Sequence, residues 1–461
     1  MSACSNDCVS FRCTSPEHEG LCYNPAPVGG GEPDQVGDER IFTKCAWRLI
    51  PLMLVLYFVN YLDRVNVAFA ALTMNRDLNF SPAQYGFAAG ILFVGYFAFH
   101  LPANLILVRI GARRWMFTIL LVWGALSAAT ALVQDPISFY VVRFFLGAAE
   151  AGLFPGLIYY LTLWFPPEYR ARYASNFLVG LPLAFVIGAP LSTALLELDG
   201  MGGLHGWQWM FVLEGLPACL LAFVVLKLLP DGPNKASWLS DEEKLFIGAR
   251  LQAQEPPEHP MLWQALIDWR VVALGFIFFA DQAAASGSRF WLPQIVQGMG
   301  FSNLMTGVIV ALPFVAAIGV MALWGRSSDM RGERVWHVAI PLLLTGGGFV
   351  IASATSSNLI ALLALSVSMI GPLMFLGPFW GFNSSFLGGS AAAGAIAFVS
   401  SLGSLGSFTG PALVGLVREK TGQFEPAMIM LALTLAASVA IMFALGRAIK
   451  ARGPTLARQP A

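Results

Sequence analysis

Two charged side chains, Arg143 and Glu150, interrupt an apolar stretch that runs from Phe139 to Phe165. They are seven residues apart, so on a helix they share one face, about two turns from each other. An ionisable side chain at membrane depth is energetically costly and usually faces a polar interior where it has a function. The alternative is a structural brace between helices formed by Arg143 and Glu150. Small residues surround the glutamate and would let a second helix approach closely: Gly147, Ala148, Ala149, Ala151 and Gly152.

A second charged pair, Asp63 and Arg64, lies in an earlier apolar stretch. Adjacent helical residues point about 100° apart, so these two need not pair with each other. The planar guanidinium of Arg64 can bind a carboxylate through two N–H groups, whether that carboxylate is Glu150 or a ligand. Asp63 could carry a proton, or it could anchor the end of its helix at the outer membrane interface.

Four further ionisable residues lie in apolar stretches: His100, Glu214, Asp281 and Arg289. The ordinary pKa of histidine lies near physiological pH, so His100 could carry protons, although a packing role suits it equally. We interpret Glu214 as structural. Asp281 and Arg289 are eight residues apart on one helix face, where they could either brace each other or contact a ligand.

The composition indicates a polytopic membrane protein. Hydrophobic residues make up 57% of the chain and charged residues 12%, against about a quarter charged in an average soluble domain. The formal net charge is zero, which gives no reason to expect a nucleic-acid partner. No catalytic motif, zinc pattern or phosphate loop occurs, so we expect neither an enzyme nor a cofactor or metal. The six cysteines, four of them among the first 22 residues, are predicted to be free thiols.

Twelve apolar stretches are long enough to span a bilayer, which predicts an all-α membrane protein of two six-helix bundles. Lysine and arginine gather on one side of these stretches, which predicts that both termini and the middle loop are cytoplasmic. We expect a disordered tail at 1–45, bundles at 46–229 and 270–449, a linker with a short helix at 230–269, and a second tail at 450–461. The predicted spans are roughly 47–70, 84–107, 115–133, 137–165, 172–196, 209–229, 271–296, 304–324, 336–354, 358–380, 390–416 and 427–446.

A weak internal repeat supports two related halves. Arginine-rich glycine turns follow the second and the eighth predicted spans, at residues 109–114 and 325–334. Such repeats are typical of transporters whose halves rock around a central site. A glycine-rich run at residues 403–411 predicts either a close helix crossing or a hinge.

Together these motifs resemble the major facilitator superfamily, and within it the anion:cation symporter family. The resemblance extends over about residues 45 to 450, and the segments 164–172, 206–215 and 236–243 are similar to the bacterial tartrate, phthalate and hydroxyphenylacetate transporter branch. The motifs are Tyr-Leu-Asp63-Arg64-Val-Asn in the first span and Arg143-Phe-Phe-Leu-Gly-Ala-Ala-Glu150-Ala-Gly-Leu-Phe-Pro in the fourth.

The resemblance implies uptake of a small organic carboxylate by alternating access, driven by a proton gradient. It implies that Asp63 and Glu150 couple protons, with Arg143 steadying these carboxylates. It further implies a substrate site formed by Arg64, Tyr96, Trp380 and Ser400. The expected setting is the inner membrane of a bacterium, where the chain would act as a monomer in the lipid bilayer.

The sequence departs from the family pattern at several positions. His100 stands where relatives in this branch often carry glutamate, and Val108 replaces the aspartate of the first arginine-rich turn. Ser400 and Ser404 replace asparagines, which shortens two hydrogen-bonding arms. Asp281 and Arg289 are not expected from the resemblance. An exporter or uniporter of an organic anion without proton coupling is the main alternative, and a membrane sensor or enzyme is a third.

Overall fold

The computed structural model describes residues 35–252, 268–386 and 389–452, and every regular element within these ranges is a helix. Twelve spans within them are long and apolar enough to cross a membrane, which confirms the predicted all-α architecture. The first half contributes α1 (Gln35–Asp77), α2 (Pro82–Ile110), α3 (Ala112–Ala129), α4 and α5 (Pro136–Glu150, Leu153–Thr162), α6 and α7 (Pro167–Leu178, Gly180–Leu196) and α8 (Gly206–Leu228). The second half contributes α11 (Trp269–Gly298), α12 (Asn303–Arg331), α13 (Val335–Ala354), α14 (Asn358–Phe386), α15 (Gly389–Thr421) and α16 (Glu425–Arg452).

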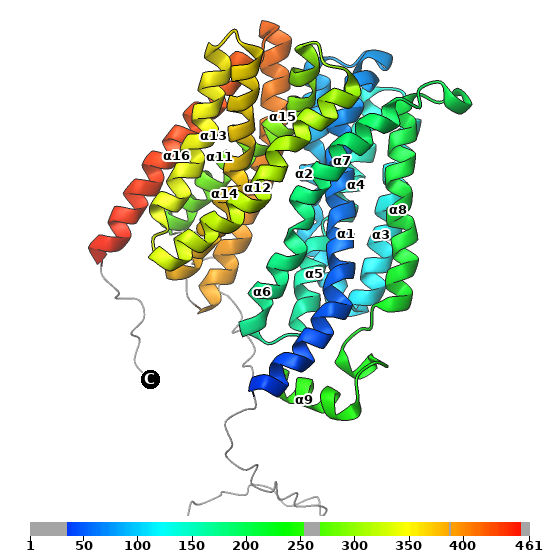
Figure 1. Cartoon of the computed structure of the whole chain (residues 1–461), viewed down its shortest axis with the longest axis vertical. Coiled ribbons are helices and arrows are strands. Elements are labelled where there is room, and N and C mark those ends of the chain that lie inside the picture. Colours follow the sequence, from blue (N-terminus) through cyan, green and yellow to red (C-terminus); the bar gives the residue numbers. More distant parts are fainter. Residues whose placement is uncertain (1–34, 253–267, 387–388, 453–461) are drawn as a thin grey trace, which may run out of the picture. The chain divides into compact units, whose positions relative to one another are not determined.

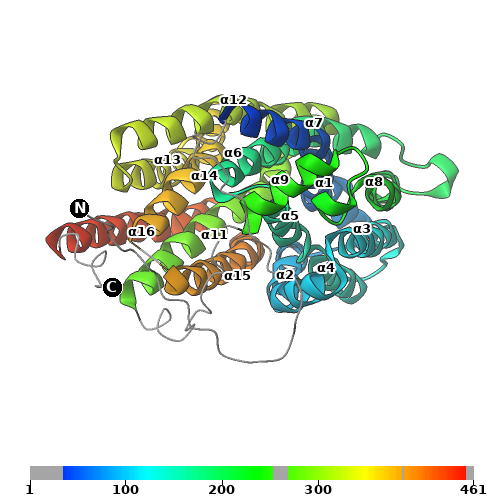
Figure 2. The ribbon, with the colours of Figure 1, turned by 90° about the horizontal axis from the view of Figure 1, so that it is seen from below.

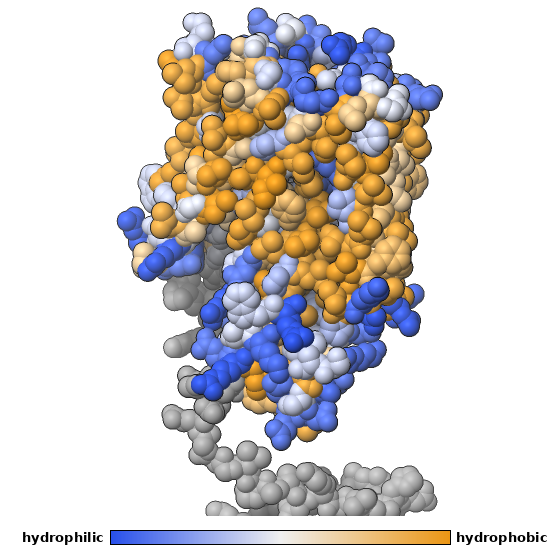
Figure 3. All heavy atoms as spheres, turned by 45° about the vertical axis from the view of Figure 1, so that its right-hand side comes forward, coloured by the Kyte–Doolittle hydropathy of each residue, from blue (hydrophilic) through white to orange (hydrophobic). Residues whose placement is uncertain are grey.

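Each half forms a six-helix bundle (Figure 1). Two of the membrane helices begin at capping boxes: Ser81 and Gln84 form one at α2, and Asp135 and Ser138 form one at α4. The side of the molecule seen in Figure 3 carries a broad band of apolar side chains between two polar ends. Large apolar residues exposed on the helices include Leu101, Val108, Leu220, Leu323 and Leu433. Such a band matches the hydrocarbon layer of a bilayer.

The two arginine-rich turns reverse the chain through glycines with positive φ. Gly111 has φ 85° between α2 and α3, and Gly332 has φ 60° after α12. In the first turn Arg113 donates to the backbone carbonyl of Leu226, near the end of α8. In the second turn Arg334 pairs with Asp329 at 2.7 Å. Both turns therefore pin helix ends, each with a different partner.

Glycines permit close helix crossings inside each bundle. A Cβ on Gly147 of α4 would collide with the backbone carbonyl of Leu92 in α2. The glycine-rich run of α15 packs in the same way on α11, where Gly406 faces the Phe279 carbonyl and Gly410 faces the Ala283 carbonyl. Of the two predictions for this run, the close crossing is the one that the structure shows.

The two bundles contact each other along α2 with α15 and along α7 with α12 (Figure 2). A Cβ on Gly86 would collide with the Pro411 carbonyl, and Phe185 stacks on Phe314 with ring centroids 4.0 Å apart. At the start of α2, the Glu419 carboxylate of α15 accepts hydrogen bonds from the backbone N–H of Ala83 at 2.9 Å and from the Ser81 hydroxyl at 2.6 Å. The α2–α15 contacts therefore join the first turns of α2 to the last part of α15.

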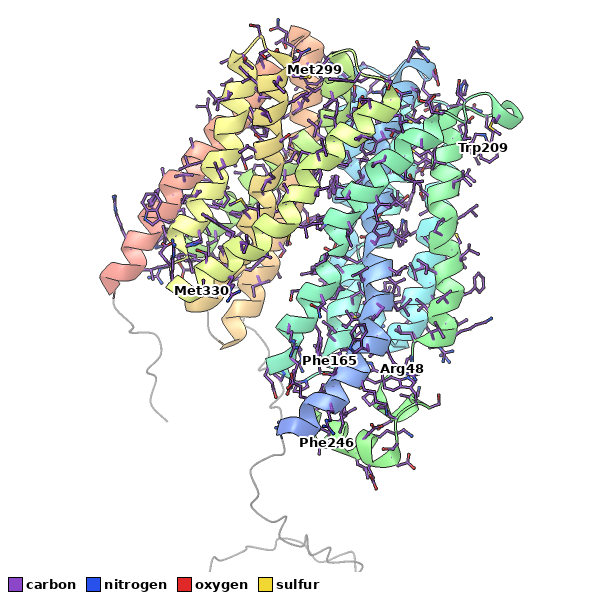
Figure 4. All side chains as sticks on the ribbon, viewed as in Figure 1. Arg48, Phe165, Trp209, Phe246, Met299 and Met330 are labelled. Carbon is purple, nitrogen blue, oxygen red and sulfur yellow. The ribbon has the colours of Figure 1, made fainter. Side chains whose placement is uncertain are left out.

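A short helix, α9 (Asp241–Gln252), lies between the halves of the sequence. Ser240 and Glu243 form its capping box. Glu243 also accepts from Lys44 of α1 at 2.8 Å, and this hydrogen bond, together with that from the Ser240 backbone, holds the pKa of Glu243 below its usual value. Figure 4 places Phe246 of α9 at the same end as Arg48 and Phe165, while Met299 and Trp209 lie at the other end.

Cys45 and Cys219 are free thiols, as predicted. The other four cysteines and the predicted disordered tail up to residue 34 lie outside the described residues, as do linker residues 253–267 and the last nine residues of the second tail.

Candidate functional site

An ion pair between α1 and α4 is the centre of the candidate site. The Nε of Arg64 donates to Oε2 of Glu150 at 2.5 Å, and the Glu150 side chain is fully buried. The guanidinium lies over the rings of Tyr96 at 4.9 Å and Tyr61 at 5.3 Å. Glu150 is the last residue of α4, and α5 starts at Leu153. The two aromatic faces and the carboxylate fix the direction in which Arg64 points.

Arg143 does not pair directly with Glu150. Its side chain is 0% exposed, and none of its three guanidinium nitrogens has a hydrogen-bond partner among the described residues. It interacts electrostatically with both Asp63 and Glu150. The structural alternative of a direct Arg143–Glu150 brace is therefore not formed here, because Glu150 bonds to Arg64 instead.

Asp63 lies in the middle of the bundle, on another face of α1. Its carboxylate accepts from Trp123 Nε1 at 2.7 Å, from Asn66 Nδ2 at 3.1 Å and from the hydroxyl of Ser127. The residue is 1% exposed and α1 continues to Asp77, so Asp63 is not an anchor at the helix end. The donors Trp123 and Ser127 tie α1 to α3, and Asp63 is not among the residues that line the cavity described next.

A cavity between the two bundles gives space beside Arg64. It offers about 90 Å³ to the centres of water-sized molecules, several times what one water needs. Its polar lining is shared by both bundles and includes two arginines; these residues are Tyr61, Arg64, Gln282, Ser286, Arg289 and Ser407. Its apolar lining consists of Val65, Ala68, Phe93, Phe185 and Phe290. A small apolar-walled cavity with two fixed cations suits an anion.

Several residues that the resemblance implicated do not line this cavity. Tyr96 contacts Arg64, which lines the cavity, and is not itself among the lining residues. Trp380 packs on Phe278 with ring centroids 5.2 Å apart, and the backbone carbonyl of Ser400 accepts from Ser404 at 3.2 Å. His100 lies beside the Tyr96 ring at 5.5 Å.

The other buried carboxylates have different surroundings. Glu214 accepts from Ser192 at 2.7 Å and is 2% exposed, and no arginine pairs with it in the described ranges. Both carboxylate oxygens of Asp281 are buried without a hydrogen-bond partner among the described residues. In the described chain no ion pair joins Asp281 to Arg289, so the brace between them is not formed here, whereas Arg289 does line the cavity.

Gln282 and Ser286 are cavity residues that the sequence reasoning missed. Together with Arg289 they stand at positions i, i+4 and i+7 of α11, which is one face of a helix. Polar residues at this spacing within an apolar span were the available signal. The prediction considered the spacing of Asp281 and Arg289 alone, and it therefore missed the polar stripe formed by Gln282, Ser286 and Arg289.

The family is decided by comparison with known proteins. The model of the Major Facilitator Superfamily matches residues 53–411. The chain belongs to the major facilitator superfamily. Its fold agrees with a solved structure of a bacterial homolog of the human lysosomal transporter Spinster in an inward-facing and unoccupied conformation. That structure has a TM-score of 0.73 and 16% identity, over 87% of this chain and 97% of the other.

Two relatives of this major facilitator protein align over nearly their whole length. A protein of Agrobacterium vitis that carries the name tartrate transporter is 42% identical over 424 residues, which cover 91% of this chain and 98% of the relative. The metabolite transport protein NicT of Pseudomonas putida is 38% identical over 421 residues, covering 89% and 95%. The chain is thus a transporter of this superfamily, with small-molecule transporters among its relatives.

Proposed function

We propose that this transporter takes up a small organic carboxylate together with protons, by alternating access. The observation that carries the proposal is the Arg64–Glu150 ion pair at the edge of the cavity. Arg64 is the natural partner for a ligand carboxylate, because its planar guanidinium matches two oxygens at once. The name of the Agrobacterium vitis relative supports a carboxylate, since tartrate is one.

Proton coupling follows from competition for one guanidinium. When Glu150 is ionised it holds Arg64, and a ligand carboxylate must displace it. When Glu150 carries a proton it no longer competes as an anion, and Arg64 is released to the ligand. Anion and proton therefore favour each other's binding, and the coupling is reciprocal. Arg143 and Asp63 belong to the same electrostatic cluster, and we assign them supporting roles in the proton step.

Alternating access requires a second arrangement of the two bundles. The α2–α15 and α7–α12 contacts close the cavity at the end where α2 begins. The lysine and arginine distribution assigns the opposite end, where α9 lies, to the cytoplasm of a bacterium. The described arrangement is then closed toward the outside of the inner membrane. The chain would act as a monomer and would use the proton gradient without any cofactor.

The test is a panel of organic carboxylates assayed for uptake into proteoliposomes with an imposed pH gradient. We expect at least one carboxylate to accumulate above its external concentration only when the inside is alkaline. Downhill flux that ignores the pH gradient would replace the symporter with the uniporter, and accumulation driven by an opposite gradient would indicate an exporter. Cations transported in preference to anions would contradict the assigned role of Arg64.

A further inference from the structure

The cavity holds one arginine from each bundle. Arg64 lies on α1 and Arg289 on α11, which are the first membrane helices of the two halves. The Arg64 guanidinium lies over the Tyr61 ring at 5.3 Å, and Tyr61 lines the cavity together with Arg289. The two cations therefore face a common space from opposite sides of the bundle interface. Among the residues that the structure describes, a carboxylate bonds to Arg64 and none bonds to Arg289.

Arg289 has no anionic partner within 4 Å in the described part of the chain, and no hydrogen bond of its guanidinium is found there. Its nearest ring contact is Phe185, 5.8 Å from the guanidinium carbon, which is a wall of the cavity. Ser286 and Gln282 lie on the same face of α11, about one turn and about two turns before Arg289. A guanidinium in an apolar-walled cavity needs an anion or water to satisfy its donors.

We propose that Arg289 is a second carboxylate site, so that the transported molecule is a compact dicarboxylate held between Arg64 and Arg289. The inference rests on the proposed function, because it takes an organic anion as the substrate and names its class. One carboxylate binds Arg64 in place of Glu150. The other binds Arg289, with the Gln282 side-chain amide as a neutral donor beside it, while the Ser286 hydroxyl donates to the Gln282 backbone carbonyl at 2.6 Å. Asp281 interacts with Arg289 electrostatically but forms no hydrogen bond or ion pair with it here, so the N–H groups of Arg289 stay available to a ligand.

The test compares dicarboxylates with their own monoamides, which have almost the same shape and one anionic group fewer. Malonate, succinate, tartrate and adipate, each with its monoamide, are titrated by calorimetry against the purified full-length protein. The wild type should bind the best dicarboxylate about tenfold or more tightly than its monoamide, as expected for one charge-assisted pair. Arg289→Gln should lower affinity for the dicarboxylate to that of the monoamide and leave monoamide affinity within about twofold.

Arg418→Gln is the matched control. Arg418 is also an arginine of a membrane helix stacked on aromatic rings, over Phe424 at 4.1 Å, but it does not line the cavity. Its replacement removes the same charge and should leave the ratio of the two affinities unchanged. If Arg289→Gln does not fold, Arg289→Lys carries the test, because loss of the planar fork should shrink the dicarboxylate advantage several-fold.

Failure of this inference and failure of the proposed function give different results. If no carboxylate binds or is transported by the wild type, the proposed function fails. If dicarboxylate and monoamide bind the wild type equally, or if Arg289→Gln weakens both by the same factor, Arg289 is not a second carboxylate site although anion transport stands. Rescue of Arg289→Gln by Asp281→Asn would likewise overturn the inference, because it would show that Arg289 serves to balance Asp281.

Discussion

Replacing Glu150 by glutamine should separate anion binding from proton coupling. Glutamine keeps the shape of the side chain and removes its charge, as a permanently protonated glutamate would. In the structure this carboxylate is fully buried and bonds to Arg64 at 2.5 Å, so little water screens the interaction. Every ligand carboxylate that uses Arg64 must displace the ionised Glu150, whereas glutamine competes only as a neutral acceptor.

The size of the effect follows from the bond that is displaced. A hydrogen bond to a charged group contributes roughly 1.5–3 kcal/mol. Since about 1.4 kcal/mol corresponds to a factor of ten, Glu150→Gln should bind the anion roughly 10- to 100-fold more tightly than the wild type on the alkaline side of neutrality. On the acid side, where the wild-type residue gains its proton, the two proteins should converge. The variant should therefore lose the pH dependence of binding.

Two assays measure anion binding and proton-driven transport separately. Titration of the purified protein at several pH values gives affinity, and proteoliposomes give transport. Glu150→Gln should still exchange labelled for unlabelled substrate across the membrane and should fail to accumulate substrate when a pH gradient is imposed. Glu214→Gln is the matched control, because Glu214 is equally buried but accepts from Ser192 and not from an arginine.

A folded Glu150→Gln protein that binds the anion with the wild-type pH dependence would refute competition between Glu150 and the ligand for Arg64. It would also be refuted if Glu214→Gln abolished that dependence while Glu150→Gln did not. Either result would leave Arg64–Glu150 a structural contact between α1 and α4.

Three further predictions address neighbouring features. Asp63→Asn should make the pH dependence of binding shallower and lower the melting temperature, because an amide N–H replaces an acceptor among three donors; an unchanged slope in a folded variant would make Asp63 purely structural. Gly86→Leu should prevent the close packing of α2 on the Pro411 carbonyl and leave the cavity open at that end. Cysteines placed in the cavity should then react with a labelling reagent added from outside. Unaltered labelling would contradict closure of the cavity by the α2–α15 contact. The Lys44–Glu243 contact should stabilise α9 above the ordinary pKa of the carboxyl and be lost as pH falls through its lowered pKa. Amide protection factors in α9, corrected for intrinsic exchange, should therefore fall at acid pH, and they should fall less in Lys44→Ala, where the Ser240 contact remains.

Much of the architecture could be predicted because membrane spans are encoded locally. A span is a run of apolar residues of a certain length, and no long-range contact is needed to recognise it. The same holds for the capping box of α9, whose two partners are Ser240 and Glu243, three residues apart. Pairing of Arg64 with Glu150 was one of two possibilities at the level of sequence, because the arginine could equally have served only a ligand.

The remainder of the site depends on packing between helices. Arg143 and Glu150 share α4, and the pairing of Glu150 with Arg64 depends on how α1 packs against α4. Trp380 and Ser400 were assigned to the substrate site by resemblance alone, and a resemblance does not say which side chains line the cavity. The spacing of Gln282, Ser286 and Arg289 was sufficient to predict the stripe. The sequence analysis looked for charges that could pair, whereas the stripe is found by asking which polar residues share one face of the helix.

The division of the two arginines between the bundles also bears on how transport would avoid leakage. In the absence of ligand, Arg64 is occupied by Glu150 and Arg289 has no anionic partner in the described chain, so neither arginine pulls the two bundles together. A dicarboxylate would bind one cation in each bundle and release Glu150 to a proton. Only the fully loaded cavity would then be free of uncompensated charge, and only that state should favour closure around the substrate. A ligand with one carboxylate would leave Arg289 unsatisfied, so it should bind without promoting the rearrangement that carries it across.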